Sequence, residues 1–358
     1  MWERSLGALL ALSAAGLFGA SVPLAKLLLG TIGATSLAGL LYLGAGIGVG
    51  LLLAVRACFQ SRPTEAPLSR TDWPWLGAVV IAGGIIGPIL LMTGLQTTPA
   101  TSAALLLNLE SIFTLLIAWL IFHENVDRRI AVGALTILGG AVALSWQGSI
   151  DTPRWGALAV IGACLAWAID NNLTRRLALA DPLIIVTVKG LAAGPITLAL
   201  AAVLGESFPS ASLAIAAGGI GAIGYGGSLI AFVLALRRLG TARTCAYFAT
   251  APFIGATLAI LLLNEPLTPQ LLLATLLMGI GVYLHLTEQH EHSHRHDPLV
   301  HTHRHRHDSH HQHLHPSEDP PGEPHSHQHA HAPLQHSHPH YPDSHHRHRH
   351  RCVDGSGI

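Results

Sequence analysis

The stretch Thr101–Glu124, TSAALLLNLESIFTLLIAWLIFHE, decides the class of fold. It is long enough to cross a bilayer, because a membrane-spanning helix needs about 20 predominantly apolar residues. Asn108 and Glu110 nevertheless lie near its middle, and Glu110 is the only formally charged residue between Trp73 and His123. A carboxylate at that depth costs a few kcal/mol or more, so it is usually paired, protonated or functional. We therefore expect a membrane protein with a functional carboxylate.

The composition of the whole chain supports this interpretation. Half of the 358 residues are hydrophobic and only 11% are charged, whereas a soluble domain has about 25% charged residues. The four cysteines are scattered and form no CxxC pair, which argues against a disulfide framework or a thiolate metal site. No catalytic triad, HExxH motif or Walker loop is present, and the GxGxxG at Gly219–Gly224 lies within an apolar run. We expect neither an enzyme nor a nucleic-acid-binding protein, and no required cofactor.

Ten apolar runs predict ten membrane-spanning helices, because strands of a membrane barrel would alternate with period two. The first run begins after Arg4 and could be a signal peptide, but it continues past Pro23 and is longer than the usual apolar core of about 7–15 residues. We interpret it as a retained helix. The ten predicted spans are Leu6–Leu29, Ala34–Ala57, Trp75–Leu95, Thr101–Phe122, Ile130–Trp146, Trp155–Leu173, Leu183–Leu204, Leu213–Leu236, Thr241–Leu263 and Gln270–Leu286.

Arginines in the connecting segments predict the orientation, because positively charged loops stay in the cytoplasm. One set of alternate loops contains nine arginines and the other contains only Arg154. Both termini are therefore expected to be cytoplasmic, in a bacterial inner membrane. The nine arginines are Arg56, Arg62, Arg70, Arg128, Arg129, Arg175, Arg176, Arg237 and Arg238.

The outline of the chain repeats. An offset of 141 residues maps Gly94–Gly140 onto Ala235–Gly281, and an offset of 149 sets Phe18 on Trp167. Because each half has an odd number of spans, the second half enters the membrane from the opposite side, and such inverted repeats place a substrate site near the midplane. We predict an all-α polytopic protein with five-helix repeats at residues 1–148 and 149–287, followed by a tail at residues 288–358.

This arrangement resembles the EamA-type transporters of the drug/metabolite transporter superfamily. In that family the fourth helix of each half tends to end on Glu followed by Pro, as in Glu265-Pro266 here, whereas His123-Glu124-Asn125 lacks the proline. The first helix often carries an aromatic beside small residues, as in Phe18-Gly19-Ala20-Ser21 and Trp167-Ala168. The resemblance covers residues 1 to about 287 and implies secondary transport of small organic metabolites. It does not name a substrate.

Polar residues within the spans are the candidate substrate site. Each has a plainer alternative: a packed polar pair for Asn108 and Glu110, solvation of a helix end for Asp170, snorkelling for Lys189, and buried packing for the tyrosines. The predicted substrate-binding residues are Asn108, Glu110, Asp170, Asn171, Asn172, Lys189, Tyr225 and Tyr247.

The tail contains 23 of the 25 histidines, mostly as HxH, with few apolar residues. This composition predicts disorder, and imidazole is a ligand that suits Ni, Zn, Co and Cu. We expect metal binding there, although compositional drift without a role is the alternative. The predicted metal ligands are His292, His294, His296, His301, His303, His305, His307, His325, His327, His329 and His331.

Three hypotheses for function follow. The first is a secondary transporter, acting as an exporter of a small metabolite, with the lipid bilayer and its substrate as partners and with self-association into a homodimer. The second is an exporter of Ni, Co or Zn, for which the tail collects or senses the ion. The third is a membrane-anchored metal buffer. The two membrane histidines, His123 and His285, lie at span ends, which favours the first hypothesis over the second.

Overall fold

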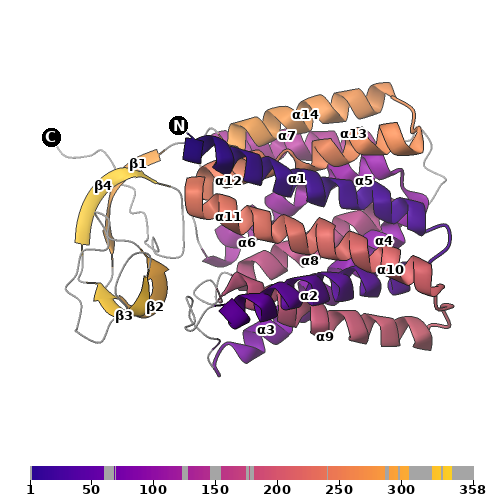
Figure 1. Cartoon of the computed structure of the whole chain (residues 1–358). Coiled ribbons are helices and arrows are strands. Elements are labelled where there is room, and N and C mark those ends of the chain that lie inside the picture. Colours follow the sequence, from indigo (N-terminus) through magenta and orange to yellow (C-terminus); the bar gives the residue numbers. More distant parts are fainter. Residues whose placement is uncertain are drawn as a thin grey trace.

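The computed structural model describes residues 2–59, 68, 70–122, 128–145, 155–174, 177, 181–239, 241–286, 290–296, 299–305, 325–331 and 334–340. Within these residues, seven helical spans are long and apolar enough to cross a membrane, and three shorter apolar helices lie at 129–144, 251–263 and 269–284. Each of the ten corresponds to one predicted span. The predicted polytopic helical fold is confirmed, and Figure 1 shows the spans packed side by side as one bundle.

The first half contains α1 (Trp2–Leu28), α2 (Ala34–Phe59), a third span made of α3 (Trp73–Val79), the π-helix η1 (Val80–Ile86) and α4 (Gly87–Thr97), a fourth made of α5 (Ala100–Leu106) and α6 (Leu109–Phe122), and α7 (Arg128–Ser145). The second half contains α8 (Trp155–Thr174), α9 (Pro182–Val203), an eighth span made of α10 (Ala211–Ile220), the π-helix η3 (Gly221–Gly227) and α11 (Ser228–Leu239), a ninth made of α12 (Thr241–Phe248) and α13 (Ala251–Leu263), and α14 (Pro269–Leu286).

Every span exposes large apolar side chains on the outside of the bundle. In water such a surface would be unfavourable, but lipid tails are as apolar as leucine, so these side chains fit a hydrocarbon environment. The bundle interior is filled largely by small residues, and Ala11, Ala14 and Ala15 of α1 are fully buried in it. One exposed residue from each span, in chain order, is Leu9, Leu51, Ile81, Leu120, Leu135, Leu158, Ile196, Ile215, Leu261 and Leu276.

The two halves share their helix irregularities. The π-helices η1 and η3 have the same length and begin at Val80 and Gly221, 141 residues apart. A turn at 107–108 breaks the fourth span, and a turn at 249–250 breaks the ninth. In Figure 1 the third span runs from α3 to α4 in the direction opposite to the run from α10 to α11, which is the relation expected of inverted repeats.

The contact between α7 and α14 repeats the same symmetry at the level of single residues. A methyl group added to Gly140 would lie 3.0 Å from the carbonyl oxygen of Ala274, and one added to Gly281 would lie 2.6 Å from the carbonyl oxygen of Gly133. Gly140 and Ala274 correspond to Gly281 and Gly133 at the offset of 141 residues. Glycine is required at both positions because the two backbones approach closely there, as small residues permit in membrane helices.

Glycines also bring the two halves together at α2. A side chain on Gly44 would collide with the backbone of Gly218 on α10, and one on Gly46 would collide with Gly190 on α9. Gly221 of the GxGxxG stretch would likewise collide with the carbonyl oxygen of Leu41. The stretch therefore serves helix packing.

Charged side chains cap helix ends at the end of the bundle where α1 stops, which we call the far end. The carboxylate of Glu206, in the loop after α9, accepts hydrogen bonds from the amides of Thr35 (3.0 Å) and Ser36 (2.8 Å) at the start of α2. Gly33 lies beside this carboxylate, which would overlap any side chain added there. Helix N-termini carry amides without partners and a partial positive charge, so an anion stabilises them.

A second cap of this kind joins the ninth span to the fourth. Glu265 accepts hydrogen bonds from the amides of Ala100 (2.7 Å) and Thr101 (2.8 Å) and from the Thr101 hydroxyl (2.7 Å). Asn264, which precedes it, has the left-handed conformation (φ 52°) that asparagine adopts more readily than most residues. The predicted structural role of Glu265 is thus accounted for, whereas Glu124 lies outside the described residues.

Lys26 caps a helix C-terminus, where the unpaired groups are carbonyl oxygens. Its ammonium group donates to the carbonyl oxygens of Leu95 and Thr98, the latter at 3.0 Å, where α4 ends. These carbonyls have no partner within the helix, and a cation is favoured beside them. At the opposite end of the bundle, which we call the near end, the carboxylate of Asp181 caps α9 through the Leu183 amide (2.9 Å) and pairs with Arg56 of α2.

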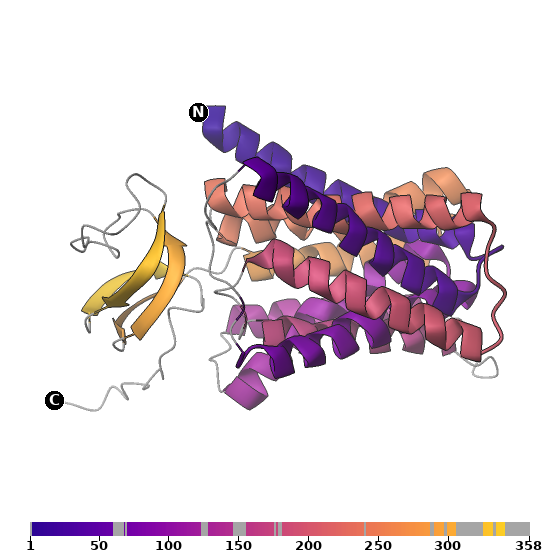
Figure 2. The same cartoon turned by 60° about the horizontal axis from the view of Figure 1, so that its bottom comes forward.

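The tail is predicted to be disordered, and more than half of it lies outside the described residues. The described tail residues form four strands, β1 (His290–His296), β2 (Leu299–His305), β3 (His325–His331) and β4 (Leu334–His340). Strand β1 pairs with β4 and β2 with β3, both antiparallel. In these four segments, the alternation of histidine with other residues has the period of two that suits a strand. Figures 1 and 2 both show the strands beyond the near end, where α1 begins.

Replacing Glu206 with Gln tests the far-end cap. Burial raises the pKa of this carboxyl, but the hydrogen bonds from Ser36 and Thr35 outweigh that effect and hold the pKa below its usual range. Because the folded pKa is the lower one, the stabilisation is fully present above the unfolded pKa of about 4.3 and is lost as the pH falls through the folded pKa. We expect the variant to lose about 1 kcal/mol at pH 7.

Thermal unfolding of the detergent-solubilised protein at pH 7 and at pH 4 measures this difference. The difference in unfolding temperature between the wild type and Glu206→Gln should be smaller at pH 4 than at pH 7. The matched control is Ser207→Ala, an exposed neighbour in the same loop, which should leave stability unchanged at both values. A gap that does not depend on pH would show that the charge of Glu206 does not stabilise α2.

Candidate functional site

Glu110 lies at the start of α6, directly after the break at Leu107–Asn108. Its position in the first turn of a helix places the carboxylate where the helix dipole favours negative charge. The side chain is half-buried, and its Oε1 accepts a hydrogen bond of 2.7 Å from the Asn171 amide of α8. Glu110 belongs to the first half and Asn171 to the second, so this contact crosses the interface between the repeats.

A buried ion pair lies next to this contact. The ammonium group of Lys189 on α9 donates to Oδ2 of Asp170 on α8, and their side chains are only 15% and 8% exposed. The hydroxyl of Thr174, one turn further along α8, lies 3.3 Å from the other carboxylate oxygen of Asp170. Partial removal from water makes such a pair costly to disrupt on one side only.

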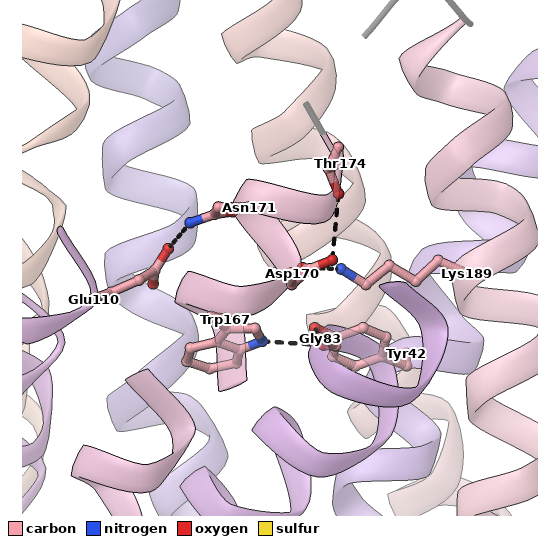
Figure 3. Close-up of polar contacts among 8 residues, drawn as sticks. All are labelled: Tyr42, Gly83, Glu110, Trp167, Asp170, Asn171, Thr174 and Lys189. Atoms are coloured by element: carbon pink, nitrogen blue, oxygen red, sulfur yellow. Dashed lines mark hydrogen bonds and ion pairs between the residues drawn. The ribbon is translucent and has the colours of Figure 1, made fainter. Parts of the chain in front are cut away.

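The π-helix η1 borders this cluster through Gly83 (Figure 3). The carbonyl oxygen of Gly83 accepts hydrogen bonds from the Tyr42 hydroxyl (2.6 Å) and from the Trp167 indole nitrogen (3.0 Å). A side chain on Gly83 would overlap the carboxylate of Asp170. A π-helical segment leaves carbonyls free of the regular i→i−4 pattern, and here that oxygen joins α2, α8 and the third span.

Two buried polar atoms in the same region lack a hydrogen-bond partner among the residues that the structure describes. They are Oδ1 of Asn172 and the hydroxyl of Thr114. The amide nitrogen of Asn172 donates to the carbonyl oxygens of Ala168 (2.9 Å) and Thr114 (3.3 Å). Thr114 lies four residues after Glu110 and therefore on the same face of α6. A buried polar atom without a partner costs about 1–3 kcal/mol, so this face is suited to a polar ligand.

The remaining predicted site residues lie elsewhere or connect indirectly. Asn108 is buried, and its amide donates to the Leu105 carbonyl (2.9 Å) and contacts the Met278 sulfur on α14 at 3.9 Å. Tyr225 on η3 packs against Tyr42 with the two rings tilted by 47° and their centroids 5.7 Å apart, and so borders the cluster. Tyr247 is half-buried on α12, where its carbonyl accepts from the Thr250 hydroxyl (2.6 Å).

The structure therefore brings together Glu110, Asp170, Asn171, Asn172 and Lys189. Sequence reasoning missed Tyr42, Gly83, Trp167 and Thr114 as members of this cluster. Trp167 had a usable signal, because the internal repeat sets it on Phe18, which packs edge-on against Tyr225 at 5.7 Å. A tyrosine, a glycine and a threonine in apolar spans carry no comparable signal, since all three are ordinary packing residues in membrane helices.

Within the helical spans that the structure describes, no three or more His, Cys, Asp or Glu side chains are positioned to hold a metal ion. Of the eleven predicted metal ligands, His307 lies outside the described residues and the other ten lie on the strands β1, β2 and β3.

Comparisons with known proteins agree with this architecture. The model of the EamA-like transporter family matches residues 5–146 and 154–287. An uncharacterized transporter of Methanothermobacter thermautotrophicus is 28% identical over 79% of this chain and 86% of its own length. The uncharacterized inner membrane transporter YedA of Escherichia coli is 24% identical over 69% of this chain and 82% of its own.

A solved crystal structure superposes with a TM-score of 0.57 at 20% identity, covering 79% of this chain and 96% of the other, which shows a shared fold. The family match spans both five-helix halves and stops before the histidine-rich tail. This multi-pass membrane protein belongs to the EamA-like transporter family.

Proposed function

We propose that the protein is a secondary transporter that exports a small organic metabolite by alternating access, without chemical conversion of the substrate. The observation that carries the proposal is the polar cluster between the repeats. Glu110 comes from the first repeat, and Asn171, Asp170 and Lys189 come from the second. Inverted-repeat transporters bind their substrates at such interfaces and move by rocking one repeat against the other.

The charges of the cluster favour a cation or a proton at Glu110. Asp170 and Lys189 neutralise one another, whereas Glu110 has an amide as its side-chain partner. With all three groups ionised, the cluster carries one net negative charge, which is expensive within a membrane. Binding of a proton, or of a positively charged group on the substrate, removes this cost. The free polar atoms of Asn172 and Thr114 then supply hydrogen bonds to the remainder of the ligand.

Export of a divalent metal is less well supported as the activity. A pathway for such an ion needs imidazole, thiolate or clustered carboxylate ligands, and the described spans provide no group of three. The family of the chain also argues against a purely buffering role, because relatives that cover most of it are named as transporters. We therefore treat metal binding by the tail as a separate property.

Replacing Glu110 with Gln tests the role of the carboxylate, because it preserves the shape and the acceptor for Asn171 while removing the charge. A hydrogen bond to a charged group contributes about 1.5–3 kcal/mol, so transport should fall about tenfold or more. The pH dependence of transport should weaken as well. The substrate for this assay comes from a growth screen of a deletion strain against metals, amino acids and drugs.

The control for Glu110→Gln is Asp72→Asn, which removes a carboxylate at the start of α3, outside the cluster. Both variants should unfold at the wild-type temperature in detergent, and the control should transport normally. Wild-type transport and an unchanged pH profile in Glu110→Gln would remove the carboxylate from the mechanism.

The ion pair is tested by a double-mutant cycle of Asp170→Asn and Lys189→Met. Each single change leaves one charge without its partner in a largely buried place, which costs about 3–5 kcal/mol, whereas the double change removes both charges. We expect thermal unfolding in detergent to show that the double variant is more stable than either single variant. Transport should nevertheless remain low in the double variant. If the double variant recovers both stability and transport, the ion pair serves only to hold α8 against α9.

The proposed orientation has the near end, with both termini, in the cytoplasm of a bacterial inner membrane. Among the described residues, Arg56 and Arg238 lie near the last turns of α2 and α11, and Arg128 and Arg129 begin α7, all at that end. Positive charge is retained on the cytoplasmic side. Reporter fusions at Gly148, after the fifth span, should therefore report the outer side, and fusions at Thr287, after the tenth, should report the cytoplasm. The reverse pattern would show that every loop lies on the side of the membrane opposite to the one proposed.

A further inference from the structure

The tail contains a direct repeat of 16 residues that its composition conceals. Residues 290–305 read HEHSHRHDPLVHTHRH, and residues 325–340 read HSHQHAHAPLQHSHPH. The two copies agree at nine positions, namely seven histidines, one proline and one leucine. Agreement in the position of proline and leucine, as well as of every histidine, distinguishes this arrangement from a tract that is merely rich in histidine.

The strands pair the two copies in opposite directions. The first half of copy one, β1, lies antiparallel to the second half of copy two, β4, and β2 lies antiparallel to β3. Because each copy has alternating histidines on both sides of its central proline, antiparallel pairing sets histidine opposite histidine. In the β1–β4 ladder the histidine pairs are His290–His340, His292–His338 and His294–His336.

The β2–β3 ladder has the same number of histidine pairs. They are His301–His329, His303–His327 and His305–His325. A leucine ends the row in each ladder, since Leu334 lies opposite His296 and Leu299 lies opposite His331. The positions between the histidines are mixed, and include Ser293 opposite Ser337 and Thr302 opposite Gln328.

Directly opposite residues share one face of an antiparallel ladder, and so do residues two apart along a strand. The three pairs of each ladder therefore form a double row on one face. Opposite Cα atoms lie about 4.5–5.5 Å apart, and the next pair lies about 7 Å further along. Two successive pairs thus place four histidine positions within the small area that a tetrahedral or square-planar metal centre requires.

We propose that each of the two ladders is a binding site for a late first-row divalent transition ion, such as Zn²⁺ or Ni²⁺. The double row consists of histidine positions alone, because Glu291, which pairs with Pro339, alternates with the histidines and belongs to the other face. Such a ligand set favours these ions over Mg²⁺ or Ca²⁺. The ion links segments that are 42–50 positions apart in the first ladder and 20–28 in the second. This proposal does not depend on the transport function or on its substrate.

Pairs of spin labels on the full-length protein in detergent micelles test the proposal. The four native cysteines are first replaced, and cysteines for labelling are then introduced at Ser293 and Ser337, or at Thr302 and Gln328. These positions pair in the register but carry no histidine. A third protein, labelled at Ser293 and Gln328, is the control, because the register does not pair these two residues.

Zn²⁺ is the probe because it is diamagnetic and leaves the label signal intact. An ion that binds only the paired strands must stabilise the pairing. Pulsed dipolar measurements should therefore give a short distance for both register pairs, and Zn²⁺ should raise the urea concentration at which that distance is lost. Equal shortening in the control protein would indicate non-specific collapse and overturn the proposal, as would the absence of any effect of Zn²⁺ on either register pair.

A histidine exchange then separates the two ladders. Replacing His336, His338 and His340 with Gln should abolish the effect of Zn²⁺ on the Ser293–Ser337 distance and preserve it for Thr302–Gln328. The matched control replaces His310, His311 and His313, three histidines of the same tail that are outside the described residues and belong to neither copy of the repeat. It should change neither distance. If the two exchanges reduce the effect of Zn²⁺ on both distances to the same extent, metal binding depends only on the number of histidines in the tail. That result would contradict the proposal of two ladder sites.

Discussion

The rest of this structure depends on one constraint, the need of every backbone amide and carbonyl within a bilayer to find a partner without water. A continuous helix satisfies this constraint along its length, but the amides at its start and the carbonyls at its end have no partner within the helix. Here charged side chains from the second repeat supply partners to helices of the first: Glu206 caps α2 and Glu265 caps α5. The two halves are thereby joined at the far end by bonds whose primary role is to satisfy the backbone. Caps of this kind hold helix ends in register while leaving the middle of the membrane free of such links.

The same constraint explains why irregular backbone gathers around the polar cluster. Non-helical backbone at membrane depth is tolerated where it is buried in protein or lines a cavity. The break before α6 gives Glu110 the position of a helix start, and η1 frees the Gly83 carbonyl for Tyr42 and Trp167. The symmetry-related irregularities, η3 and the break before α13, surround an aromatic contact between Phe18 and Tyr225. A charged cluster thus lies beside η1, whereas an aromatic contact lies beside η3, although the two π-helices are related by the internal repeat.

Close approach between helices has a different physical basis, because lipid provides no hydrophobic force that would press the spans together. Contacts must come from packing, and glycine supplies them at α2 against α9 and α10 and at α7 against α14. The reciprocal contacts of Gly140 and Gly281 show that the pseudo-two-fold relation survives at the level of atoms even where sequence identity between the halves is sparse. A small side chain at these positions is enough to permit such an interface, whereas a lipid-facing position requires only an apolar side chain.

The sequence by itself determined the ten spans, the inverted repeat and the presence of a lone carboxylate, Glu110, in the fourth span, because hydropathy and a charge within an apolar run are local properties of the chain. It left the partners of that charge open. The bond between Glu110 and Asn171 joins residues 61 positions apart, and the pairing of Asp170 with Lys189 depends on how α8 and α9 are rotated against each other. Tyr42, Gly83 and Thr114 became visible only in the assembled bundle, since nothing in their type distinguishes a site from packing. In the tail, composition indicated disorder, yet the period of two suited strands, and only pairing between distant copies decided which histidines lie opposite one another.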